Sequence, residues 1–197
     1  MTSTVRRGRR PGSPDTRSVI LAVARERFAE QGYAATSVRR IAAAAGVDPA
    51  LVHHYFGTKN DLFLAALELP VDPTLVVERM VTGGLPGAGE RIVRTMLAVW
   101  DDEAMGQPML ALVRRVVEPG GGWMFHDGVL RLVLLPVGRG LGIDQVERRM
   151  ALVASQVFGA VLLRKLVGVE PLASAAADEL VATYAPVVQR YLEVDLP

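Results

Sequence analysis

The chain concentrates arginine near its N-terminus, and clustered guanidinium groups are the chemistry of a surface that binds phosphate. Residues 1–62 hold ten Lys and Arg against five Asp and Glu, while the other 135 residues hold 12 basic and 16 acidic side chains. A basic end joined to a mildly acidic body favours a polyanion as the partner of that end. The alternative is a basic tail without a further role. Four of these arginines fall within the first ten residues: Arg6, Arg7, Arg9 and Arg10.

Two short helices separated by a glycine turn are predicted downstream of this arm. Apolar residues recur at three- and four-residue steps from Thr36 to Phe56, with a break at residues 45–47, Ala-Gly-Val. Asp48 is typical of a helix cap, and Pro49 suits a first helical turn, where a missing N–H costs nothing. The pattern indicates a helix–turn–helix, whose second helix enters the major groove of DNA. Similar helical hairpins also occur as plain packing units.

Candidate DNA contacts follow from this geometry. A recognition helix points its first residues at the bases, and Pro49, Ala50 and Leu51 offer no hydrogen bond, so readout there is expected to be apolar, as with thymine methyl groups. The polar side chains of the preceding helix expected to touch the DNA backbone or groove are Ser37, Arg39 and Arg40. The arginine arm either enters an A·T-rich minor groove or adds only general electrostatic affinity.

The same region resembles the TetR family of bacterial regulators. The resemblance is carried in order by residues 20–28, 32–38, 41–47 and 53–62. In that family a tyrosine usually stands where this chain has His53, and a histidine where it has Tyr55, so the swap keeps two side chains able to reach phosphate. The resemblance also implies a homodimer, an operator in double-stranded DNA and a small-molecule effector. It adds to the expected DNA contacts His53, His54, Tyr55 and Lys59.

The elements that must position these residues are all predicted to be helices. Helical periodicity dominates, no strand pattern is found, and nine or ten helices are expected, in an all-α fold. Glycines at 32, 46 and 57 end the first three helices, and Thr58 to Asp61 reads as a capping box for a fourth. A bend is expected at Pro136, and Asp144 is expected to cap a long helix. The predicted domains are a basic arm at 1–14, a DNA-binding head at 15–69, and a ligand-binding and dimerisation body at 70–197.

Two stripes in the last long helices predict the contact between two copies of the chain. A single helix–turn–helix makes few base contacts, so specificity normally needs two copies on a two-fold site. The alternative is that both stripes are buried within one subunit. The expected interface residues are Val146, Met150, Val153, Val157, Ala160, Val161, Arg164, Tyr184, Val187, Val188 and Tyr191.

Aromatic and methionine side chains in the body favour an apolar pocket lined by adaptable groups, although such residues are more often plain core. The candidate lining residues are Met96, Trp100, Met109, Trp123, Phe125, Gln156 and Phe158.

Several classes of activity are disfavoured. The chain has no cysteine, which excludes a disulfide scaffold and a thiolate site and suits the cytoplasm. No metal or other cofactor is expected, because His53 and His54 are adjacent and point about 100° apart on a helix. No glycine-rich phosphate loop or nucleophile elbow indicates an enzyme. The apolar run at 150–163 is too short to span a bilayer, so no membrane partner is expected.

These patterns together favour a sequence-specific DNA-binding regulator of transcription in the bacterial cytoplasm, associated with the nucleoid. We expect a repressor that a small apolar or amphipathic ligand releases from a palindromic operator. The alternative is a DNA-binding protein without such a switch, regulated by a protein partner or by its own concentration.

Overall fold

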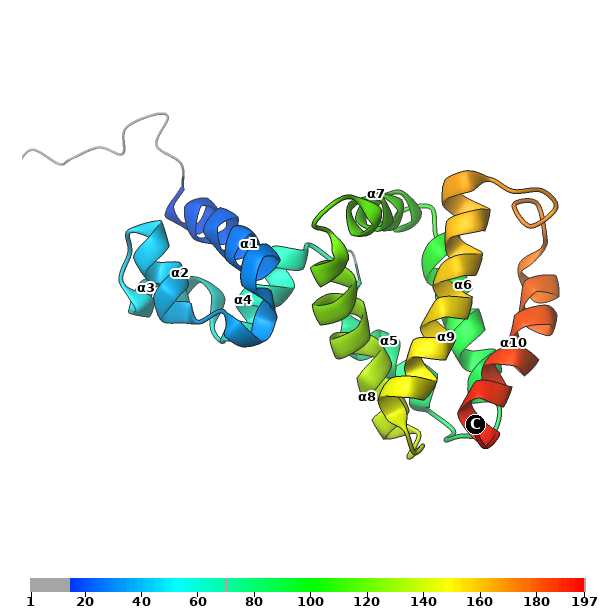
Figure 1. Cartoon of the computed structure of the whole chain (residues 1–197). Coiled ribbons are helices and arrows are strands. Elements are labelled where there is room, and N and C mark those ends of the chain that lie inside the picture. Colours follow the sequence, from blue (N-terminus) through cyan, green and yellow to red (C-terminus); the bar gives the residue numbers. More distant parts are fainter. Residues whose placement is uncertain (1–14, 70, 197) are drawn as a thin grey trace, which may run out of the picture. The chain divides into compact units, whose positions relative to one another are not determined.

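The structure, a computed structural model, describes residues 15–69 and 71–196, and it divides into a head that ends at Ala66 and a body that begins at Leu67. Within those ranges all regular structure is helical, in ten α-helices and two π-helical segments, which confirms the all-α prediction (Figure 1). The division falls three residues before the expected one at 69/70. The arm with Arg6, Arg7, Arg9 and Arg10 lies outside the described residues.

The head consists of four helices around a small apolar core. These are α1 (Thr16–Ala35), α2 (Val38–Ala45), α3 (Pro49–Phe56) and α4 (Lys59–Leu67). The ring of Phe63 meets Phe28 and Tyr33 edge-on, with centroids 4.9 Å apart in each pair. Gly32, the predicted end of the first helix, interrupts α1 with φ 71°, but the helix resumes after it and ends at Ala35. The Thr36 hydroxyl then donates to the Gly32 carbonyl at 2.8 Å, which ties down the end of the helix.

The body contains the remaining elements. They are α5 (Pro73–Val81), α6 (Ala88–Asp101), α7 (Gly106–Val117), η1 (Met124–Leu134), α8 (Leu135–Gly140), α9 (Val146–Val161), η2 (Leu162–Val167) and α10 (Ala177–Glu193), where η marks a π-helix. Helix α5 is not among the expected helices, although it starts like the recognition helix, with an aspartate cap and a proline: the Thr74 N–H donates to Asp72 at 2.8 Å. The change from π to α geometry at Leu135 lies next to Pro136, which has no N–H to donate to the helix ladder.

The expected cap of α9 by Asp144 is wrong. Gln145 takes the left-handed conformation before the helix, with φ 44°, and makes no capping hydrogen bond. The Asp144 carboxylate instead accepts from Nε of Arg149 at 2.7 Å. The buried guanidinium of Arg149 also donates to the carbonyls of Tyr191 and Val194, at 2.9 and 2.8 Å. Asp144 therefore balances a charge that holds the end of α10, and this long-range role is not visible in local sequence.

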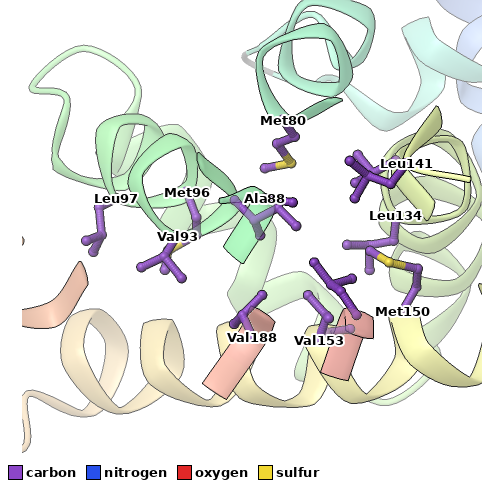
Figure 2. Packing of buried hydrophobic residues seen from close by; sticks show 14 of the residues in the cluster. Met80, Ala88, Val93, Met96, Leu97, Leu134, Leu141, Met150, Val153 and Val188 are labelled. Atoms are coloured by element: carbon purple, nitrogen blue, oxygen red, sulfur yellow. The ribbon is translucent and has the colours of Figure 1, made fainter. Parts of the chain in front are cut away.

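Helix α6 packs closely against α10, and this contact organises the core of the body. Gly89 of α6 lies so near α10 that an added Cβ would stand 2.5 Å from the Ala185 carbonyl oxygen. The Gly89 N–H donates to the side-chain oxygen of Gln189 at 2.7 Å, across the same contact. Figure 2 shows Val93 and Val188 from the two helices in one buried cluster, to which α9 contributes Val153.

Replacing Gly89 by alanine is expected to destabilise the body, because the new methyl group would meet backbone atoms that cannot turn away. Overpacking of this kind costs about 1–3 kcal/mol, and the midpoint of thermal unfolding, followed by circular dichroism, should fall by several degrees. Gly122→Ala is the matched control, since a Cβ added at Gly122 would meet no other atom within 4 Å. Equal melting temperatures for the two variants would contradict the close approach of α6 to α10.

Candidate nucleic-acid interface and ligand cavity

The turn between α2 and α3 is held by local hydrogen bonds that the sequence predicts. Ser37 caps α2 by accepting from the Arg40 N–H at 3.3 Å, and Asp48 caps α3 by accepting from the Ala50 N–H at 2.7 Å. Gly46, with φ 68°, closes α2 in the left-handed conformation that a glycine adopts without strain. The two helices are therefore fixed relative to each other by their own caps and turn.

The apolar faces of α2 and α3 are buried inside the head, and their polar faces are exposed on its surface. Ile41, Val52 and Phe56 are buried. Arg39 is exposed and makes no hydrogen bond or ion pair with any described residue, while Arg40 reaches the Ala35 carbonyl at 3.5 Å. The exposed residues among the candidate DNA contacts of the two helices are Ser37, Arg39, Arg40, Ala50, His53, His54 and Tyr55.

At the start of α3, exposure differs among the three apolar candidates. Ala50 is exposed, whereas Pro49 and Leu51 are half-buried. A methyl group is thus the most accessible side chain at the end of the helix that is expected to face bases. This arrangement suits apolar contact with a thymine methyl and offers no hydrogen bond to a base edge.

The imidazole of His53 is engaged within the head. Its Nδ1 lies 2.7 Å from the Gly57 carbonyl oxygen. Because a carbonyl oxygen only accepts, Nδ1 must carry the proton, and in the neutral ring Nε2 is left as an acceptor. The ring of His54 packs against Tyr55, with centroids 5.5 Å apart. Within the described residues, no group of three or more His, Cys, Asp or Glu side chains is placed to hold a metal ion.

Lys59 begins α4 but its ammonium reaches back to the end of α1. Nζ donates to the Tyr33 carbonyl at 2.5 Å and lies 4.1 Å from the centroid of the Tyr33 ring. One of its three N–H groups is used in this way. The position of the charge is therefore set by Tyr33, a partner that the resemblance to a phosphate-contacting lysine does not indicate.

The capping box predicted at the start of α4 is confirmed. The Asp61 carboxylate accepts from the Thr58 hydroxyl at 2.7 Å and from the Thr58 N–H at 2.9 Å, and the Asp61 N–H donates back to the Thr58 hydroxyl. These bonds, with the hydroxyl first, lower the pKa of Asp61 below its ordinary value. Gly57 is required beside them, because its φ is 77° and a Cβ would lie 2.9 Å from the Asp61 carboxylate.

The body contains a partly open apolar cavity of about 150 Å³. Five of the seven candidates are among its lining residues: Met96, Trp100, Met109, Phe125 and Phe158. Trp123 and Gln156 are not. Gln156 lies on a different face of α9 from the lining residues Val153 and Val157. The polarity of a single residue does not indicate which face of its helix lines a cavity. Figure 2 shows Met96 and Val153, two of the wall residues, within the buried cluster.

Lining residues outside the predicted set come from α6, from η1 and from the segment after α4. Thr95 of α6 and Val129 of η1 belong to the wall, as do Leu69 and Val71. The amphipathic pattern of α6 could have indicated Thr95, because it neighbours Met96 on a helix with a clear apolar face. The role of residues 69 and 71 depends on tertiary packing and has no local signal.

Most of the predicted dimer residues are used inside one subunit. Met150, Val153, Val161 and Val188 are buried in the body core, so they cannot contact a second copy. The partly buried Val146, Val157, Tyr184 and Tyr191 pack against the same core. Ala160 is half-buried beside Arg164. Of the eleven residues Val187 alone is exposed. The reason is that neighbouring helices of the same body cover both stripes: α6 packs against α10, and Gly138 of α8 lies against Val146 and Met150.

Arg164 has an intramolecular partner instead. Its Nη1 donates to Asp101 at 2.7 Å, and Lys165 donates to the same carboxylate at 2.5 Å. Burial on its own would raise the pKa of Asp101, but the hydrogen bonds from Lys165 and Arg164 outweigh it and hold that pKa below its ordinary value. This ion cluster joins the end of α6 to η2.

The continuous helix formed by α9 and η2, Val146–Val167, is 22 residues long and, within the described residues, is the one helix long and apolar enough to cross a membrane. It is longer than the uninterrupted apolar run at 150–163, because helix continues on both sides of that run. Only 22% of its most apolar window is buried inside the body. Leu163 and Val167 are 43% and 61% exposed.

Comparison with known proteins gives matches to both units. Residues 20–66 match the family model described as bacterial regulatory proteins, tetR family, and residues 87–192 match that of the tetracyclin repressor-like C-terminal domain. A transcriptional repressor of the helix–turn–helix type from Mycobacterium tuberculosis is 44% identical over 66 residues, which are 34% of this chain and 35% of that protein. The chain thus spans about a third of the length of the curated relatives it matches.

Two further relatives extend the comparison. A transcriptional activator from Mycolicibacterium smegmatis is 37% identical over 67 residues, 34% of this chain and 31% of that protein. The crystal structure of a TetR-family regulator from Streptomyces coelicolor is 41% identical, covers 94% of this chain and 98% of that one, and has a TM-score of 0.48. With the two family models spanning head and body, the chain belongs to the TetR family of bacterial regulatory proteins.

Proposed function

We propose that this protein is a sequence-specific DNA-binding repressor of transcription in the bacterial cytoplasm. The observation that carries the proposal is the α2–α3 pair, whose apolar faces are buried while Arg39, Arg40 and the α3 side chains stay exposed. Membership of the family supports the same activity. Because relatives of the head include both a repressor and an activator, repression is the direction favoured by the relative with the higher identity.

Arg39 is proposed to contact phosphate, since it is exposed, charged and unengaged within the described residues. Each phosphate contact contributes about one counterion to the salt dependence of DNA binding. Lys59 is proposed to contribute its positive charge from a position set by Tyr33. Ala50 is proposed to supply apolar base contact.

Arg39→Ala is expected to weaken binding to the operator several-fold and to lower the slope of log affinity against log salt by about 1. The measurement is fluorescence anisotropy on duplex DNA from immediately upstream of the protein's own gene, with a scrambled duplex for comparison. Arg139→Ala, which removes an exposed charge from the body, is the matched control and should change neither quantity. Equal effects of the two variants would indicate general attraction to DNA without a specific contact.

A dimer is proposed to form through the exposed side of α9 and η2, because the stripe expected from the sequence is already covered. Leu163 and Val167 lie four residues apart on this exposed side, and Val187 of α10 is exposed as well. Because so little of this long apolar helix is buried inside one subunit, we infer that a second copy of the chain packs against it. Two heads would then read a two-fold operator.

Leu163→Asp is expected to yield monomers in sedimentation velocity and to abolish tight operator binding, because a carboxylate would be buried in an apolar contact. Leu75→Asp is the control, since Leu75 is exposed on α5. Circular dichroism should show both variants folded. A folded Leu163→Asp dimer, or dissociation caused by Leu75→Asp, would contradict this interface.

The cavity supports a small-molecule switch over the alternative without one, which requires a filled core. Leu69 and Val71 of its wall follow α4 directly in the chain. Leu67, the last residue of α4, lies against η1, where a Cβ on Gly128 would stand 3.3 Å from it. A ligand that binds more tightly to the conformation unable to fit the operator lowers operator affinity by its coupling factor.

A further inference from the structure

The cavity wall is almost purely hydrocarbon. It is lined by 24 described residues, and none of them carries a charged side chain. The exceptions to an apolar surface are the hydroxyl of Thr95 and the indole N–H of Trp100. A charged guest would lose its hydration in such a cavity without gaining a partner, which is costly for a carboxylate or an ammonium group.

Thr95 is the one lining residue with a hydroxyl, and that hydroxyl has no hydrogen-bond partner among the described residues. The residue is 9% exposed. Two other threonines of the body behave differently: the hydroxyls of Thr82, which follows α5, and of Thr183 in α10 donate to backbone carbonyls four residues earlier, at 2.7 and 2.9 Å. As the one hydroxyl of an otherwise apolar wall, it is the group placed to bond a polar atom of a bound guest.

One cluster of charged groups beside the wall is paired internally. Asp101 follows Trp100 of the wall, and its carboxylate takes hydrogen bonds from Arg164 and Lys165. All three groups are engaged with one another, and none of them is a residue of the wall.

The volume limits the size of the guest. A cavity of about 150 Å³ lined by aliphatic and aromatic side chains is the size that holds a benzene-sized molecule. We infer that the effector is an uncharged, mainly hydrocarbon molecule of that size or slightly larger, with one oxygen that hydrogen-bonds to Thr95. The effect of this molecule on transcription rests on the proposed repressor function, whereas its binding to the cavity does not.

The test uses four probes of matched size on the full chain: 1-hexanol, hexanoate, hexylammonium and benzene. Binding is measured at neutral pH by tryptophan fluorescence, since Trp100 lines the cavity, and by titration calorimetry. We expect 1-hexanol and benzene to bind, and both ions to bind at least about 100-fold more weakly. Ions that bind as tightly as 1-hexanol, or no binding of any probe, would overturn the inference.

The role of the hydroxyl is tested by Thr95→Val, which keeps the shape of the side chain. The affinity for 1-hexanol should fall about fivefold, as for loss of one hydrogen bond, while the affinity for benzene stays unchanged. Thr183→Val is the matched control because Thr183 lies outside the wall. An unchanged affinity for 1-hexanol in Thr95→Val would refute the assignment.

A parallel operator titration separates this inference from the proposed function. Probe binding that obeys the expected pattern but leaves operator binding intact would uphold the ligand class and contradict release by ligand. Specific operator binding without any probe binding would uphold the DNA-binding function and overturn the ligand class.

Discussion

The close approach of α6 and α10 at Gly89 sets the position of a helix on which most of the body depends. With no side chain at that point, the two backbones come near enough for Gln189 to bond the Gly89 N–H. One face of α6 is then committed to the core through Val93, and another to the cavity through Thr95 and Met96. Its last residue, Asp101, holds the cations of η2. A shift of α6 would therefore alter core, cavity and ion cluster together.

Features controlled by neighbouring residues could be predicted from the sequence. The Thr58–Asp61 box and the Asp48 cap each join groups within three residues of one another, so their geometry is encoded locally. Asp144 fits the same local rule, yet its carboxylate is bound by Arg149, which itself serves the distant end of α10. A local rule fails where a long-range partner competes for the same group.

The predicted dimer stripe illustrates a different limit. An apolar stripe shows that a helix face is covered, but not by which neighbour, and Met150 and Val188 are already buried within one body. Five of the seven cavity candidates lie in the wall, where aromatic and methionine side chains from several helices fill irregular space. Gln156 and Trp123 do not line the cavity, because the polar or aromatic character of a residue does not determine which face of its helix it occupies.

The separate cores of head and body have an evolutionary consequence. The residues that position the DNA-reading surface, such as Ile41 and Phe56, are distinct from those that shape the cavity, such as Val129 and Val153. A substitution that adds or removes one methylene in the wall changes which guest fits while leaving the operator unchanged. Descendants of a duplicated gene can thus diverge in the signal they sense before they diverge in the genes they control, through changes no larger than valine to isoleucine.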